Sequence, residues 1–502
     1  PRRFICMCSI AVRAACEALW ISLRDREFCC SNNFAPLPLA GEVGAKRRVR
    51  VRARACGEFD AVGGSTLTPA LSRQRERENS LHPLSHEPPA PVTLSPRSRS
   101  DAAAVPLPTL PPATPLVLLN ARVFAPEPLG VRHLLLGGGS ILWMGEDAEE
   151  VRHVPGAKTL DLHGARLVPG FIDGHVHVTG GGEEAGFSTR VPALPLSNYT
   201  AHGITTVIGL LGTDDVARGP RELIATLYGL RELGLSAYGH CGGYHLPPAT
   251  LTGSVRGDIV FVEPLIGVGE LAVSDHRSSQ PTLDELLRVA SEAHVAGLMT
   301  GKAGIVHLHL GDGERGLELV SRALAQSELP PRVFQPTHVN RRRALFDEAL
   351  QLARRGVTID ATAFPVAEDE DAWSAATALL RYLDAGLPAK RFTISSDAGG
   401  CLPCFDAHGH IEHMDVGDSG ALLETLGDVL AAGLPLERAL PPFTSNVADL
   451  LRLPNKGRIA LGADADLLVL DDANHAATVI AQGRVHRHEG RTVRSGPFEP
   501  VE

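Results

Sequence analysis

The chain has 502 residues, of which 44% are hydrophobic and 21% are charged, and its formal net charge is -10. This length suffices for a large core and more than one domain, and the composition is ordinary for a soluble globular protein. The negative charge argues against a general nucleic-acid binder, and no apolar run approaches the roughly 18 residues of a membrane span. We therefore expect neither a nucleic-acid nor a membrane partner.

Residues 1–112 differ in pattern from the rest of the chain. They hold six of the nine cysteines, and 16 Lys and Arg against 10 Asp and Glu. Their apolar residues show neither a sustained helical periodicity nor a sustained alternation. A signal peptide fits poorly because Arg13 and Glu17 interrupt the apolar stretch, so we expect a cytoplasmic protein. The missing initiator Met and the repeat-like segment 66–78 indicate that 1–112 is an over-extended gene start and is disordered. A zinc module is the alternative, although none of these six cysteines shows CxxC spacing.

From about residue 116 short strands around Gly-rich turns are expected, and strands return near the C-terminus. Because the two groups flank the central region, they could pair with each other. We expect a small β-sandwich domain built from 113–168 together with 455–499. Its predicted strands lie within 116–124, 133–144, 159–167, 457–470 and 476–487.

Strands and amphipathic helices alternate through the central region. In the expected helix 342–355, Phe346, Ala349, Leu350 and Ala353 form one apolar stripe. Eight such units favour an α/β fold, a (β/α)8 TIM-type barrel over 169–454, with a doubly wound open sheet as the alternative. The eight strands are expected at 171–178, 204–211, 236–239, 265–273, 304–310, 333–339, 357–362 and 392–396.

Histidines and carboxylates occur at the ends of five of these strands. His175 and His177 lie two residues apart on one strand, so their side chains point to the same face and can share a divalent metal. In such barrels the active site lies at the C-terminal ends of the strands. Four imidazoles and two carboxylates at that rim could hold two divalent ions bridged by a hydroxide. The six candidates are His175, His177, Glu270, His309, His338 and Asp397.

The segments around these residues resemble the amidohydrolase superfamily, and in particular bacterial isoaspartyl dipeptidases (β-aspartyl peptidases). PGFIDGHVH at 169–177 is shared across the superfamily. A much narrower group of proteins shares the combination of GGGEEAG at 180–186, LTGSV at 251–255 and SDHRS at 274–278. The resemblance covers about 114–499 and includes GLLGTD at 209–214, PTHVNR at 336–341 and SSD at 395–397.

The resemblance implies a metal-dependent hydrolase, a metallopeptidase that cleaves β-aspartyl dipeptides. It makes His175, His177 and Asp397 the ligands of one metal ion and His309 and His338 ligands of a second, with Zn in both positions. It also implies that Asp397 accepts the proton of the bridging hydroxide and delivers it to the leaving amine.

Glu270 stands where the family has a bridging lysine that is carboxylated on its side chain. The chain has five lysines, and none lies on the fourth strand. Aligning 266–268 and 274–277 places Glu270 at the lysine position, with one extra residue between them. Because a glutamate carboxylate can bridge two metals without bicarbonate, we expect a working site, in which the inserted Gly269 brings the shorter side chain closer.

A β-aspartyl dipeptide carries a free α-ammonium group and a free α-carboxylate, so its site needs an anion and a cation. The resemblance assigns the ammonium group to Glu184, helped by Thr213 and the backbone of Gly182. It assigns the carboxylate to Arg277 and Arg341, whose guanidinium forks suit a planar anion.

Two further residues of the site follow from the resemblance. Tyr244 matches the tyrosine that hydrogen-bonds the developing oxyanion. Cys401 replaces a serine near the substrate carboxylate, and a thiol is the weaker donor, so we expect a shift in affinity or selectivity. The resemblance also implies a homo-oligomer, an octamer. An amidohydrolase acting on N-acyl amino acids or cyclic amides and a non-catalytic scaffold of the same fold are the alternatives.

Overall fold

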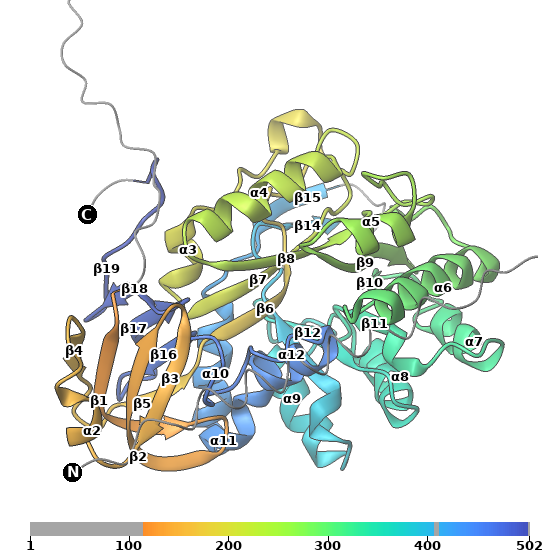
Figure 1. Cartoon of the computed structure of the whole chain (residues 1–502). Helices are drawn as coiled ribbons and strands as arrows, with labels where there is room; N and C mark the ends of the chain where they lie inside the picture. Colours follow the sequence, from red (N-terminus) through yellow and green to blue (C-terminus); the bar gives the residue numbers. More distant parts are fainter. Residues whose placement is uncertain (1–113, 406–410, 500–502) are drawn as a thin grey trace, which may run out of the picture. The chain divides into compact units, whose positions relative to one another are not determined.

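The structure, a computed structural model, describes residues 114–405 and 411–499. The expectations for 1–112, an over-extended gene start or a zinc module, fall outside these residues. Figure 1 shows a β-sheet region beside a larger region of strands and helices. No helix within the two described ranges is both long and apolar enough to cross a membrane.

A nine-stranded sheet joins both ends of the described chain (Figure 1). Its order is β19-β18-β17-β16-β5-β1-β2-β3, with β4 paired to β1. β16 runs antiparallel to β5, with Leu467 opposite Pro169, so the C-terminal strands attach where the chain enters the central region. The two-layer sandwich and the domain boundaries remain predictions. The strands are β1 (Leu116–Phe124), β2 (Pro128–Gly137), β3 (Ser140–Gly145), β4 (Lys158–Asp161), β5 (Arg166–Pro169), β16 (Leu467–Leu470), β17 (Ala476–Ala481), β18 (Arg484–His488) and β19 (Arg491–Thr492).

Eight parallel strands follow one another in chain order through the central region. β6 to β11 form one curled sheet, and β12 pairs with β13. Backbone hydrogen bonds from Val339 N to Asp360 O (3.3 Å) and from His177 N to Ala398 O (2.9 Å) link the two parts into a ring. This sequential order agrees with the predicted barrel and not with a doubly wound sheet, whose strand order reverses. The strands are β6 (Phe171–Val176), β7 (Ile204–Gly209), β8 (Ser236–Cys241), β9 (Leu265–Val273), β10 (Val306–Leu310), β11 (Phe334–Thr337), β12 (Ile359–Thr362) and β13 (Phe392–Ser395).

Helices pack against these strands through their apolar faces. The predicted helix at 342–355 is α8, which buries the stripe that includes Phe346 and Ala349. The Thr282 side chain caps the N-terminus of α6, and Gly301 follows its last residue with a left-handed φ of 78°, which favours glycine. The helices are α2 (Glu149–Arg152), α3 (Leu196–Thr200), α4 (Pro220–Glu232), α5 (Val255–Phe261), α6 (Leu283–Thr300), α7 (Glu318–Ala325), α8 (Arg343–Arg354), α9 (Ala375–Asp384), α10 (Ala421–Ala431), α11 (Leu436–Ala439) and α12 (Ser445–Leu451).

An antiparallel hairpin follows β13. β14 (Cys401–Phe405) pairs with β15 (Ile411–Val416), with Cys401 opposite Val416. Cys401 is therefore the first residue of a strand, and the backbone pairing with β15 restricts its position more than a loop would.

Candidate active site

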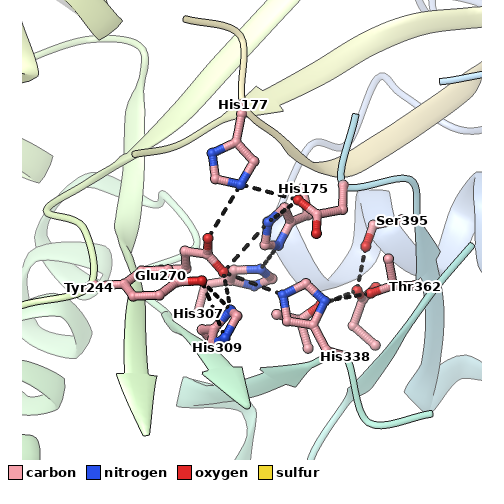
Figure 2. A network of polar contacts seen from close by, with 12 residues as sticks. His175, His177, Tyr244, Glu270, His307, His309, His338, Thr362 and Ser395 are labelled. Atoms are coloured by element: carbon pink, nitrogen blue, oxygen red, sulfur yellow. Dashed lines mark hydrogen bonds and ion pairs between the residues drawn. The ribbon is translucent and has the colours of Figure 1, made fainter. Parts of the chain in front are cut away.

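The six predicted metal ligands come together at the C-terminal side of the parallel strands (Figure 2). His175 and His177 lie on one face of β6 and its continuation, because strand side chains alternate. His338 directly follows β11, Asp397 lies two residues after the end of β13, and both have a φ of 58°. This left-handed conformation is uncommon for residues other than glycine. The six are His175, His177, Glu270, His309, His338 and Asp397, each at most 7% exposed.

Glu270 lies at the centre of this cluster (Figure 2). Its Oε1 is 3.4 Å from Nε2 of His177, whereas its Oε2 is 3.5 Å from Nε2 of His175 and 3.5 Å from Nε2 of His338. Nδ1 of His309 is 3.1 Å from the same Oε2. The two carboxylate oxygens therefore face different histidines, which is the arrangement that a bridging ligand needs.

Glu270 was predicted at the end of its strand, but it lies inside β9. β9 continues to Val273, and the extra residue is accommodated as an irregularity against β10, where Val268 to Leu271 oppose Val306 to Leu308. A Cβ on Gly269 would lie 2.6 Å from the backbone oxygen of His307. Only glycine permits this close approach of β9 to β10.

Asp397 completes a second group of ligand atoms. Its Oδ1 is 3.3 Å from Nε2 of His175 and 3.1 Å from Nε2 of His177. Within the described residues, two groups could hold a metal ion, namely His175 with His177 and Asp397, and His175 with Glu270 and His338. Nε2 of His175 and Oδ1 of Asp397 are buried without a hydrogen-bond partner there. Buried polar atoms seldom stay unpaired, so these atoms suit a cation.

Charges within the cluster compensate one another. Burial disfavours the charged forms of Glu270 and Asp397, but the nearby histidines hold the pKa of both carboxyls well below the usual range. Burial also disfavours the charged form of His177, but the carboxylates of Asp397 and Glu270 beside its ring raise its pKa to about 10. A divalent cation would compete with protons for these ligands.

His309 is held on both sides by residues outside the metal groups. Its Nδ1 is 2.8 Å from the Tyr244 hydroxyl, and its Nε2 is 3.1 Å from Oδ2 of Asp275. Asp275 also accepts hydrogen bonds from Nε (3.0 Å) and Nη2 (2.7 Å) of Arg277. Asp275 belongs to the SDHRS segment but was not among the predicted site residues. Its position two residues before Arg277 was the available signal.

Four of the predicted substrate-binding residues meet beside this cluster. Oε1 of Glu184 accepts hydrogen bonds from the Thr213 hydroxyl (2.7 Å) and from Nη1 of Arg277 (2.7 Å). The other oxygen, Oε2, is buried and has no hydrogen-bond partner among the described residues. Burial and the neighbouring Glu184 carboxylate raise the pKa of the Cys401 thiol to about 12, so Cys401 lies beside Glu184 as a protonated group.

Arg341 stands apart from this group. Its Nε is 3.0 Å from Oδ1 of Asp312, and its Nη1 donates to the backbone oxygen of Leu310 (2.7 Å). Gly182 has a φ of 100°, and a Cβ there would lie 2.3 Å from the backbone oxygen of Thr189, so this turn requires glycine.

One cavity of about 1330 Å³ unites these residues. Twelve of the thirteen predicted site residues line this cavity. The thirteenth, His175, is fully buried and does not line it. The lining includes His177, Gly182, Glu184, Thr213, Tyr244, Glu270, Arg277, His309, His338, Arg341, Asp397 and Cys401. The cavity therefore combines the proposed metal ligands with charged groups of both signs.

Comparisons with known proteins identify the family of the chain. Residues 166–486 match the model of the amidohydrolase family. A crystal structure of β-aspartyl dipeptidase from the thermophilic, keratin-degrading Fervidobacterium islandicum AW-1, in complex with β-Asp-Leu dipeptide, is 40% identical. It covers 77% of this chain and 100% of its own, with a TM-score of 0.72. The family match and this similar structure imply a TIM-type barrel for the chain.

Two curated relatives are less similar. A deacetylase from Brucella anthropi is 25% identical over 401 residues, which make up 73% of this chain and 87% of the relative. An adenine deaminase from Geobacillus kaustophilus is 26% identical over 358 residues. The matched region is 67% of this chain but only 52% of the deaminase, so the chain spans about half the length of that relative.

Proposed function

Because this chain belongs to the amidohydrolase family and is a metal-dependent hydrolase, we propose that it hydrolyses β-aspartyl (isoaspartyl) dipeptides. The observation that carries the proposal is the contact of Glu184 with Thr213 and Arg277 next to the metal-ligand cluster. It places an anion and a cation in one cavity with the ligands, which suits a substrate that carries both charges. The β-aspartyl dipeptidase from F. islandicum supports the same substrate class.

Two divalent ions, Zn in our proposal, fit the residues present. The unpaired, buried Nε2 of His175 and Oδ1 of Asp397 suit a cation, and Glu270 offers one oxygen to each side of the cluster. When bound, the ions would polarise the amide carbonyl and lower the pKa of water towards ~7, which supplies hydroxide at neutral pH. We assign one ion to His175, His177 and Asp397, the other to His309 and His338, and Glu270 to both.

The charged residues of the cavity would orient the substrate. The α-ammonium group would bind Glu184, with the Thr213 hydroxyl and the Gly182 backbone beside it. The α-carboxylate would bind Arg277 and Arg341, whose guanidinium groups form charge-assisted hydrogen bonds. Both charged groups on the α-carbon of the aspartyl residue are then fixed, and the side-chain amide would face the metal ligands.

Asp397 and Tyr244 would handle the proton and the developing charge. The histidines hold the pKa of Asp397 low against its burial, so the carboxylate is ionised at neutral pH and can accept the proton of the nucleophile. It would then deliver this proton to the leaving amine. Burial raises the pKa of Tyr244 well above 10, so its hydroxyl remains protonated and can donate to the oxyanion.

A comparison of β-Asp-Leu, α-Asp-Leu and N-acetyl-aspartate as substrates tests this function, with metal content measured on the same sample. We expect hydrolysis of the β-linked dipeptide alone, by protein that contains divalent metal. Equal or faster cleavage of the α-linked dipeptide would contradict the isoaspartyl assignment. Faster cleavage of the N-acyl substrate would favour the N-acyl amidohydrolase alternative, and protein without metal or turnover would favour a scaffold.

A homo-oligomer, specifically an octamer, and a cytoplasmic location also remain proposals that rest on the resemblance and on the sequence. Light scattering coupled to size-exclusion chromatography would measure the mass of the assembly. A mass near that of one 53.3 kDa chain would contradict the oligomer.

A further inference from the structure

A line of buried polar side chains leads from His175 away from the cavity, across the interior of the parallel strands. Nδ1 of His175 is 2.8 Å from Nε2 of His307 (Figure 2), and Nδ1 of His307 is 2.9 Å from Oε1 of Gln335. Nε2 of Gln335 is 3.3 Å from Oγ1 of Thr393, which is 2.6 Å from Oδ1 of Asp360. These five residues come from five different strands, and each is at most 2% exposed.

The line ends at a carboxylate that only accepts hydrogen bonds. Besides Thr393, the hydroxyls of Thr337 (2.7 Å) and Ser395 (2.5 Å) donate to Asp360. Burial raises the pKa of Asp360, and these three hydroxyl donors oppose the rise. Because Thr393 has one hydroxyl proton and gives it to Asp360, its oxygen can only accept from the amide nitrogen of Gln335.

The donors and acceptors of the other hydrogen bonds in the line follow from the arrangement at Asp360 and Thr393. With its nitrogen towards Thr393, Gln335 presents its oxygen to His307, which must donate from Nδ1. Nε2 of His307 is then unprotonated and accepts the hydrogen bond from Nδ1 of His175. The proton of His175 therefore lies on Nδ1, and the lone pair of its Nε2 faces Glu270 and Asp397.

We propose that His307, Gln335, Thr393 and Asp360 form a positioning relay that holds His175 in the tautomer able to bind metal through Nε2. The reverse order of donors would put a proton on Nε2 of His175 and block it. His175 belongs to both candidate metal groups, and the ion that we assign to His175, His177 and Asp397 depends on its orientation. The inference rests on the metal site proposed above, but it is independent of the substrate.

The relay serves His175 and not every ligand of the cluster. Nδ1 of His338 contacts a single hydroxyl, that of Thr362, at 2.7 Å. Nδ1 of His177 has no hydrogen-bond partner within the described ranges. Since the partners behind a metal-binding histidine set its orientation, loss of the relay should affect metal binding before it affects the fold.

Two substitutions of Gln335 test the relay. Gln335→Met keeps the length of the side chain and removes both polar groups, whereas Gln335→Glu keeps an oxygen towards His307. Affinity would be measured on metal-depleted protein by Zn²⁺ competition with a chromophoric chelator, and the visible spectrum of Co²⁺-loaded protein would report the coordination. We expect a loss of about 10–100-fold in affinity and a changed Co²⁺ spectrum for Gln335→Met, and less than about threefold loss for Gln335→Glu.

His240→Phe is the matched control. His240 is fully buried and stacks on the His307 ring at 5.5 Å, but neither of its nitrogens has a hydrogen-bond partner among the described residues. Its substitution should leave the metal affinity unchanged. A folded Gln335→Met variant with wild-type affinity, or equal losses in Gln335→Met and His240→Phe, would overturn the relay.

Two further results are informative. If Gln335→Met does not fold, Thr393→Val breaks the line one residue further out, and its unchanged affinity would overturn the proposal. Wild-type protein that binds no divalent ion would overturn the relay together with the metal site. Metal binding that weakens as expected in a protein inactive on β-aspartyl dipeptides would support the relay and contradict only the proposed substrate.

Discussion

Glu184 and Arg277 form an ion pair of 2.7 Å in the wall of the cavity. These are the two side chains proposed to bind the opposite charges of the substrate. A dipeptide would have to exchange with this pair, its ammonium group replacing Arg277 at Glu184 and its carboxylate replacing Glu184 at Arg277. The pair is thus matched to a ligand that carries one charge of each sign.

Glu184→Gln should raise KM for β-Asp-Leu by about 10–100-fold with little change in kcat, because a hydrogen bond to a charged group is worth roughly 1.5–3 kcal/mol. Steady-state kinetics would measure both constants. A substrate analogue acetylated at the α-nitrogen is the control. Because it lacks the ammonium group, its KM should differ little between wild type and Glu184→Gln. A fall in kcat at constant KM would contradict a binding role for Glu184.

Activity should not depend on carbon dioxide, because the Glu270 carboxylate needs no carboxylation to bridge two ions. Metal content and kcat/KM are expected to be the same in CO2-free buffer and in buffer with bicarbonate. Glu270→Gln keeps the shape and removes the charge, and it should lower kcat/KM by more than about 100-fold through loss of metal. Stimulation by bicarbonate would show that another group bridges the ions.

Cys401 should be unreactive towards iodoacetamide at pH 8. Burial and Glu184 raise its pKa to about 12, and a raised thiol pKa means that the reactive thiolate is scarce until the pH approaches that value. Peptide mass spectrometry after timed alkylation would follow this residue alone. Cys401→Ser should remain active, because a hydroxyl can donate to Glu184 in the same way. Rapid labelling of Cys401 at pH 8 would contradict this environment.

Lys456→Met should destabilise the fold by about 3–5 kcal/mol, because it leaves the buried carboxylate of Asp466 and the half-buried one of Asp464 without their cation. Nζ of Lys456 is 2.5 Å from Oδ2 of Asp466 and 2.7 Å from Oδ2 of Asp464, and its side chain is 4% exposed. Chemical denaturation would give the free energy of unfolding. Lys158→Met is the matched control, since Lys158 is exposed, and it should change stability by less than about 0.5 kcal/mol.

The contribution of Lys456 should also depend on pH. Burial lowers its pKa, but Asp466 and Asp464 raise it above the ordinary 10.5 in the folded protein. When a lysine has a higher pKa in the folded than in the unfolded state, it stabilises the fold fully at a pH below the unfolded-state pKa. This stabilisation disappears as the pH rises through the folded-state pKa. The difference between wild type and Lys456→Met should therefore be constant near neutral pH and shrink only in alkaline buffer. A difference that shrinks on acidification to pH 6 would contradict this ion pair.

Much of the fold was predictable because its signals are local. The alternation of apolar residues predicted each parallel strand to within a few residues, and the PGFIDGHVH segment indicated the family, which the comparisons confirm. The irregularity at Gly269 was not predictable, because it depends on how β9 pairs with β10. Asp275 and His307 lie two residues before Arg277 and His309, but their own partners, His309 and Gln335, are distant in sequence, so these contacts could not be predicted.

The sheet that joins the two ends of the chain has a consequence for dissecting the protein. β5 ends at Pro169, two residues before β6, which carries His175, and its partner strand β16 comes from near the C-terminus. Leu468 and Val479 of the C-terminal strands also share a core with the central strands. A fragment cut to 169–454 would expose this apolar surface and lack most of β5, the strand that leads into the first ligands. We therefore expect that the catalytic region cannot be excised as a self-sufficient enzyme.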